Sequence, residues 1–183
     1  MEQIKIISVN ISEKKGTVKN PVDQIVLNDD GIVGDAHAGQ WHRQISLLGT
    51  DSIEKMQLAT GGEYHFGAFA ENITATGYPL YKMQPLDRLI GNEVHLEVTQ
   101  IGKKCHGERC TIYKQTGDCI MPREGIFCRV IHGGALKAGD ILEYRPKTMV
   151  IRIITVSDRA SKGIYKDKSG PLLGTLIESF FKE

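Results

Sequence analysis

The chain is built from many short apolar or alternating stretches, and turns rich in Gly and Asp separate them. The stretch NEVHLEVTQIG at residues 92–102 places Val94, Leu96 and Val98 on one face, and residues 3–12 alternate in the same way. Turn sequences such as NDDG, TGGE and TGDC end these stretches. Brief strands in this number favour a closed or strongly curved antiparallel sheet. We therefore expect a mainly β fold, a barrel with one or a few short helices.

One helix is expected within residues 51–59. Asp51 and Glu54 have the spacing of a capping box, in which both side chains bond main-chain N–H groups at the start of a helix. Ile53 and Met56 would share its buried face.

The composition changes after a linker, EYRPKT, that contains Pro146. Residues 149–183 then pass from a continuous apolar strand through a polar loop into an apolar helical segment. This order is the usual opening of an α/β domain with a parallel sheet. We expect a barrel domain at residues 1–145 and a β-loop-α appendage at residues 149–183.

Charge and terminal sequence narrow the possible partners. The 183 residues hold 23 Lys and Arg against 22 Asp and Glu, so the molecule has no general attraction for nucleic acid or anionic membranes. The first ten residues, MEQIKIISVN, have no export signal, and no apolar run reaches the length of a membrane span. We expect a cytoplasmic protein with reduced thiols, no nucleic-acid partner and no membrane partner.

Four cysteines follow one another with the spacing C-x4-C-x8-C-x8-C. They are Cys105, Cys110, Cys119 and Cys128. Structural zinc sites usually contain closer pairs, so this spacing is weak evidence for zinc even with His106 and His132 as further ligands. Cys128 lies in the apolar run GIFCRVI and is expected to be a buried small hydrophobic residue. The surroundings of Cys119 allow either a buried or a reactive thiol.

Cationic side chains surround the first two cysteines. Lys103, Lys104, His106 and Arg109 all lie within a few residues of them, and positive charge favours the reactive thiolate. The same pattern also fits an ordinary solvated basic loop. Together with Arg123 and Arg129, these cations could hold a phosphate group.

Four segments follow one another along the chain: GIVGDAHAG, RQISLL, FGAFAENITATG and a long segment from LIGNEV to KAGD. Together and in this order they resemble one known family, the MOSC domain, named for the C-terminal part of molybdenum-cofactor sulfurase. The resemblance implies a β-barrel. It also implies sulfur transfer through a cysteine persulfide, or direct contact between that cysteine and the molybdenum of the cofactor.

The resemblance also assigns site residues. The reactive cysteine of the family stands in an R-C segment shortly before a T-G pair, which here is RCTIYKQTG, so Cys110 is the first choice as catalytic thiol and metal ligand and Cys105 the second. The residues expected to bind the cofactor are Asp35, His37, Arg43, Glu71, Asn72, Arg109 and Arg123. The first five of these could equally be scaffold residues: Asp35 could stabilise a turn, and Asn72 could satisfy main-chain groups.

The C-terminal segment has a resemblance of its own. ITVSDRASKGIYKDKSGPLL is similar to the opening of the molybdopterin-binding domain of adenylyltransferase-type proteins of cofactor biosynthesis, and Ser157, Asp158 and Arg159 match its start. Most of that domain is missing, so adenylyl transfer is not expected.

Full sulfurases carry a pyridoxal-phosphate desulfurase domain, and no pyridoxal-phosphate site is evident in this chain. The resemblance therefore implies a separate cysteine desulfurase as sulfur donor, a molybdenum-cofactor centre or molybdoenzyme as acceptor, and transient contact with the molybdenum cofactor. Two alternatives remain open. One is a cofactor carrier that holds the metal through Cys110 without turnover, and the other is a redox sensor based on a disulfide between Cys105 and Cys110.

Overall fold

The computed structural model describes residues 2–105, 107, 113 and 118–181. The chain divides into two compact units, Met1–Lys147 and Thr148–Glu183, which are described separately.

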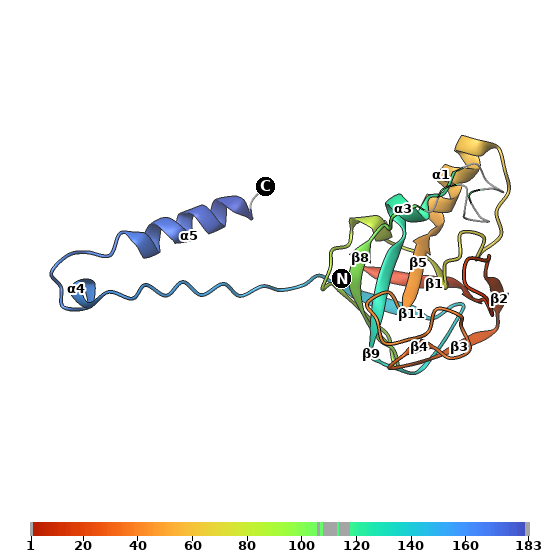
Figure 1. The fold of residues 1–183 in the computed structure, drawn as a ribbon, viewed down its shortest axis with the longest axis horizontal. Coiled ribbons are helices and arrows are strands. Elements are labelled where there is room, and N and C mark those ends of the chain that lie inside the picture. The colour runs from red at the N-terminus through yellow and green to blue at the C-terminus, as the bar shows by residue number, and fades with distance from the viewer. Residues whose placement is uncertain (1, 106, 108–112, 114–117, 182–183) are drawn as a thin grey trace. The chain divides into compact units, whose positions relative to one another are not determined.

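The larger unit contains a closed β-barrel (Figure 1). Within the described residues the strands follow the order β11-β7-β8-β9-β5-β6-β1, and pairing of β1 with β11 closes the ring. Neighbouring strands in the ring are antiparallel except β5 and β6, which are parallel. The bounds are β1 Gln3–Ile11, β5 Ile45–Gly49, β6 Ile73–Thr76, β7 Arg88–Ile90, β8 His95–Ile101, β9 Ile126–His132 and β11 Ile141–Arg145. The expected mainly β barrel is confirmed.

Shorter strands extend the barrel. β2 (Asn20–Val22) pairs with the end of β1, and a separate three-stranded sheet has the order β10-β3-β4. Its strands are β10 Ala135–Lys137, β3 Gln24–Asn28 and β4 Gly31–Ile32.

Alternation of side chains explains the core. Val94, Leu96 and Val98 are all at most 1% exposed, as their spacing predicts, and Ile4 and Ile6 of β1 are fully buried. The inward faces of the strands thus form one apolar interior.

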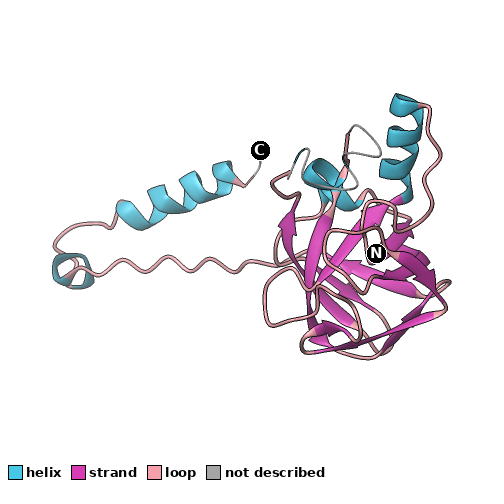
Figure 2. Ribbon diagram, turned by 45° about the vertical axis from the view of Figure 1, so that its right-hand side comes forward, coloured by secondary structure: helices cyan, strands magenta, loops and turns pink. Residues whose placement is uncertain are grey.

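The helices of this unit are short. α1 (Thr50–Thr60) and α3 (Met121–Glu124) lie at the same end of the barrel (Figure 2), and a 3-10 turn, η1, spans Leu80–Lys82. Ile53 and Met56 are buried on α1, as expected. The predicted capping box is wrong: the helix begins one residue earlier, its N-cap is Gly49, and no side chain caps it. Strand β5 ends at Gly49, and α1 begins at the next residue, Thr50. The end of the strand therefore fixes the start of the helix.

The smaller unit contains α4 (Asp158–Ser161) and α5 (Ser169–Phe180). The strand expected after residue 149 is not formed: residues 149–157 carry no strand pairing in the described part of the chain. A single strand without a neighbour leaves its N–H and C=O groups unpaired, which explains the difference. Its apolar side chains stay exposed, with Val150 at 81% and Val156 at 92%. Among the described residues, no helix is both long and apolar enough to span a membrane.

Candidate functional site

A cavity of about 120 Å³ lies at the end of the barrel where α3 begins. Segments far apart in the sequence meet there: the loop before β5, the loop before β6, and the two ends of the connection between β8 and β9. Its lining residues are His37, Trp41, Arg43, Ser46, Ala70, Asn72, Lys103, Met121 and Phe127. Three of these, His37, Arg43 and Asn72, were expected from the sequence to line a pocket.

The charged and titratable side chains that line this cavity are all basic. They are His37, Arg43 and Lys103, and no Asp or Glu is among its described lining residues. The Arg43 guanidinium carbon lies 4.8 Å from the centre of the Trp41 ring and 5.6 Å from that of Phe127. Stacking on aromatic faces leaves the edge of a guanidinium free to bind a ligand. The cavity is therefore suited to an anion.

Arg43 supports that conclusion in a second way. Its Nε atom is buried and has no hydrogen-bond partner among the residues that the structure describes. A buried donor without an acceptor is unfavourable, by roughly 1–3 kcal/mol, so an acceptor from a bound ligand would relieve the cost.

Asn72 both lines the cavity and connects three strands. Its side-chain oxygen accepts hydrogen bonds from Ser46 N (3.2 Å) and Ser46 Oγ (3.0 Å), and its amide nitrogen donates to Asn10 O at 3.2 Å. These bonds join the residue that precedes β6 to β5 and β1. They give Asn72 a scaffold role and use its side-chain oxygen and one of its two amide hydrogens.

Glu71 is completely buried and does not line the cavity. Its carboxylate accepts hydrogen bonds from Gly67 N (2.5 Å), Phe69 N (3.1 Å) and Thr74 Oγ1 (3.0 Å). Burial raises the pKa of the carboxyl, although these hydrogen bonds act to lower it. The residue fixes the shape of the loop that carries Ala70.

Asp35 also lies beneath the cavity rather than on its surface, and it pairs with the buried ammonium of Lys19. Asp35 Oδ2 accepts from Ser12 N at 3.0 Å, and Oδ1 accepts from His37 N at 3.0 Å. Burial acts to raise the pKa of Asp35, but the hydrogen bonds from the Lys19 ammonium and from the main-chain N–H of His37, together with the positive charge of Lys19, outweigh it and hold the pKa well below its ordinary value. Asp35 is therefore a buried carboxylate that orients the segment bearing His37.

The sequence from residue 34 to residue 143 matches the MOSC domain family, which covers more than half of the chain. The chain belongs to the MOSC domain family. The match ends before the smaller unit begins.

Solved structures share the fold of this MOSC domain. The YuaD protein from Bacillus subtilis is 21% identical, with a TM-score of 0.67 over 81% of this chain and 100% of that one. YiiM from Geobacillus stearothermophilus is 19% identical, with a TM-score of 0.61 over 77% of this chain and 74% of that one. YiiM from Escherichia coli is 18% identical, with a TM-score of 0.57 over 90% and 77% respectively. None of the curated proteins is similar enough in sequence to match.

The cysteines of the MOSC domain differ in accessibility. Cys110 and Arg109 lie outside the described residues. Cys105 is exposed, and its Sγ accepts a hydrogen bond from Gly107 N at 3.3 Å. Cys128 is fully buried in β9, where burial raises its thiol pKa, so the expectation of a buried hydrophobic residue is confirmed. Cys119 is also buried.

Arg123 does not line the cavity. It stands on α3 and forms an exposed ion pair with Asp118, at 2.8 Å between Arg123 Nη2 and Asp118 Oδ2. Among the described residues, no group of three or more His, Cys, Asp or Glu side chains could hold a metal ion.

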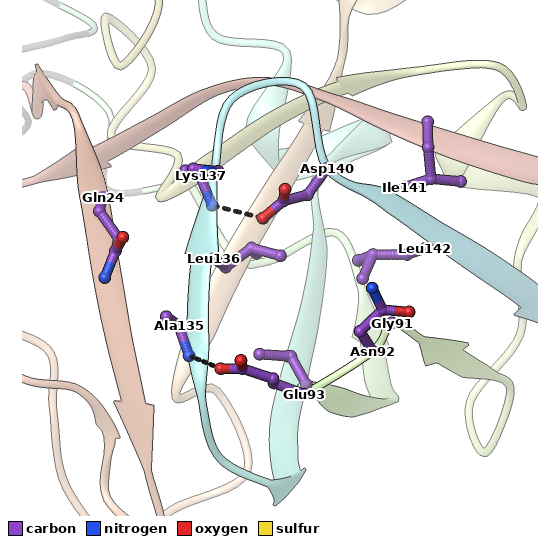
Figure 3. Close-up of a pocket in the computed structure, with 11 residues that line it drawn as sticks. Gln24, Gly91, Asn92, Glu93, Ala135, Leu136, Lys137, Asp140, Ile141 and Leu142 are labelled. Carbon is purple, nitrogen blue, oxygen red and sulfur yellow. Dashed lines mark hydrogen bonds between the residues drawn. The ribbon is translucent and has the colours of Figure 1, made fainter.

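A second cavity, of about 280 Å³, lies at the opposite end of the β8 and β9 pair (Figure 3). Residues that precede β8 and residues that follow β9 line this second cavity. The first cavity is lined instead by Lys103, which follows β8, and by Met121, which precedes β9. Its carboxylates already serve the main chain: Glu93 accepts from Ala135 N at 3.2 Å, and Asp140 accepts from Lys137 N at 2.9 Å. These bonds are structural.

Several residues of the site were not expected from the sequence. Trp41 and Phe127 form aromatic walls of the cavity, and Lys19 lies beneath it with 1% exposure. Lys19 stands in the stretch GTVKNP, whose pattern gives no sign of burial. A signal for Trp41 existed, because it is the single tryptophan and lies between the two predicted basic residues His37 and Arg43.

Proposed function

We propose that this MOSC domain is a sulfur carrier related to the molybdenum cofactor, in which Cys110 holds a persulfide and the basic cavity holds the anionic part of the acceptor. The observation that carries the proposal is the cavity itself, with His37, Arg43 and Lys103 on its walls and no described acidic side chain. A phosphate is the kind of group that such donors bind, through charge-assisted hydrogen bonds.

The position of the cavity supports a reactive thiol in the connection between β8 and β9. The segment that carries Cys110 leaves the barrel at Lys103 and returns at Met121, and both of these residues line the cavity. Cys110 is seven residues from Lys103, so an extended chain could span roughly 20–25 Å. The reactive thiol is therefore tethered to both sides of the proposed binding site.

The transfer step conserves sulfur and electrons when the acceptor is a thiolate. A desulfurase loads Cys110 with one sulfur atom, the acceptor thiolate attacks the terminal sulfur, and the bond between the two persulfide sulfurs breaks. Cys110 leaves as the thiolate. Delivery of sulfide to a metal centre also needs two electrons, which a dithiol reductant would supply. The positive charges of Lys103 and its cationic neighbours in the sequence favour the anionic form of Cys110, both as the persulfide before transfer and as the thiolate after it.

The resemblance of residues 154–173 to the start of a molybdopterin-binding domain points to the same cofactor. We include it in the proposal as independent support from the smaller unit, without assigning a catalytic role to that unit.

Mass spectrometry tests the sulfur step. The protein is incubated with a cysteine desulfurase and cysteine, and the labile sulfur that it gains is measured for the unaltered chain, Cys110→Ser and Cys105→Ser. We expect loading of the unaltered chain and Cys105→Ser, and none of Cys110→Ser. Equal loading of Cys110→Ser would refute the assignment. Molybdenum and pterin fluorescence that copurify with the protein and disappear in Cys110→Ala, without any persulfide, would instead favour a carrier that performs no transfer.

Phosphate binding tests the cavity separately. Titration with inorganic phosphate is followed by NMR for Arg43→Gln and for Arg123→Gln, a control arginine that is exposed, ion-paired and outside the cavity. Loss of a charge-assisted hydrogen bond should weaken binding by Arg43→Gln about tenfold or more and leave that by Arg123→Gln nearly unchanged. Equal effects of the two substitutions would count against the cavity as an anion site.

A further inference from the structure

The buried ammonium of Lys19 has one acceptor for each of its three hydrogens. Lys19 Nζ contacts Asp35 Oδ2, lies 3.2 Å from Ser12 Oγ, and lies 3.4 Å from His37 Nδ1. An ammonium group only donates, so the ring nitrogen of His37 that faces it must accept. A nitrogen that accepts a hydrogen bond carries no proton.

The other contacts of His37 agree with this assignment. Asp35 Oδ1 is occupied by the main-chain N–H of His37 at 3.0 Å, whereas His37 Nδ1 lies 3.6 Å from the same oxygen. A separation of 3.6 Å is too long for a hydrogen bond. The carboxylate therefore orients the backbone of His37, and the ammonium contacts its ring.

We propose that Lys19 is a positioning residue that holds His37 as the neutral tautomer with its proton on Nε2, so that the ring presents an N–H donor to the cavity. The inference rests on the proposed function for the role of the cavity, but the tautomer itself does not depend on any ligand. Nδ1 faces the buried ion pair, so Nε2, on the opposite edge of the ring, is the nitrogen left for the cavity that His37 lines.

The charged groups nearest His37 are mostly cations. Lys19 lies on its buried side, where it pairs with the carboxylate of Asp35, and Arg43 and Lys103 line the same cavity. A neutral His37 can donate a hydrogen bond to an oxyanion without first taking up a proton.

The alternative arrangement moves one proton. Burial lowers the pKa of Lys19, although Asp35 opposes the shift. If Lys19 were a neutral amine, it would accept a hydrogen bond from His37, and the ring would be a doubly protonated imidazolium. The two arrangements differ in whether Nδ1 carries a proton, and NMR distinguishes them.

The experiment is long-range proton–nitrogen NMR of the full chain labelled with nitrogen-15 in histidine, without ligand and without sulfur loading. His37→Gln assigns the signal among the six histidines. We expect an unprotonated Nδ1 and a protonated Nε2 near neutral pH. A protonated Nδ1, either in the other tautomer or in imidazolium, overturns the proposal even if no Lys19 variant folds.

Lys19→Met tests the cause. Removal of the ammonium takes away the donor to Nδ1 and leaves the Asp35 carboxylate beside it, so Nδ1 should become protonated in the folded variant, while a substitution at the exposed Lys14 should leave it unprotonated. An unchanged His37 signal in folded Lys19→Met overturns the role of Lys19. Inorganic phosphate is then added to the unaltered chain. Retention of the expected tautomer without any response to phosphate supports Lys19 as positioning residue and counts only against the anion site of the proposed function.

Discussion

Gly67→Ala should be among the most damaging small substitutions in the barrel unit. A Cβ atom at this position would lie 2.2 Å from Lys19 O and 2.8 Å from Lys19 C, and the backbone has φ +89°. The contact is with main chain, so no side-chain rotation relieves it. Gly67 N also donates to Glu71, and Gly67 O accepts from Lys19 N at 2.9 Å, so a displaced backbone would lose hydrogen bonds on both sides.

The magnitude follows from two contributions. A left-handed backbone conformation costs an ordinary residue about 1–2 kcal/mol, and insertion of an atom into a filled site costs about 1–3 kcal/mol. We therefore expect Gly67→Ala to lower the free energy of unfolding by about 3 kcal/mol or more. Gly16 is the matched control, because it has φ +77° but nothing lies within 4 Å of an added Cβ. Gly16→Ala should cost only the conformational part, about 1 kcal/mol.

Urea denaturation followed by the fluorescence of Trp41, the single tryptophan, measures both variants. Comparable slopes against urea concentration are needed for the comparison of free energies. If Gly67→Ala destabilises the protein no more than Gly16→Ala does, the close approach of Gly67 to Lys19 is wrong.

Three further outcomes are expected. Ala70 has φ +62°, so Ala70→Gly should raise the free energy of unfolding by about 0.5 kcal/mol in urea denaturation, and a loss of stability would contradict the strained conformation. Glu71→Gln places an amide donor against the N–H of Phe69 or Gly67 and should lower the free energy of unfolding by about 1–3 kcal/mol. An unchanged free energy of unfolding would mean that these hydrogen bonds contribute little. The pKa of Asp35 is lower in the folded chain than in the unfolded chain, so the unfolded chain binds the proton first as the pH falls. The free energy of unfolding should therefore decline as the pH falls below the ordinary carboxyl value of 3.8. Asp35→Asn should reduce that decline, as measured by urea denaturation at acidic and at neutral pH.

The barrel could be predicted from the sequence because each strand is indicated by the alternation or the apolar run of its own adjacent residues. Alternation in residues 92–102 assigned Val94, Leu96 and Val98 to one buried face, and the apolar run around Cys128 identified a buried strand. Each of these inferences needs only the period of a strand. The predicted capping box of α1 was wrong because the helix follows directly on β5. The end of that strand, and not a polar side chain, sets where the helix begins.

The site could be predicted only in part, because its chemistry depends on contacts between distant segments. Motif resemblance identified His37 and Arg43, which do line the cavity, but it gave Asp35 and Glu71 the same role although both lie beneath the surface in hydrogen-bonded networks. Lys19 could not be found, because its burial depends on an acceptor sixteen residues away in the chain. The assignment of Cys110 stays a prediction.

Closure of the ring has a consequence for how the protein is made. The pairing that completes the barrel joins Gln3 to Glu143, the first strand to the last. Contacts between residues so far apart in sequence are slow to form, because a long loop must close before they contribute. During synthesis β1 cannot form this pairing until β11 has been made. Until then the unpaired edge of β1 can bind other strands, including those of other chains.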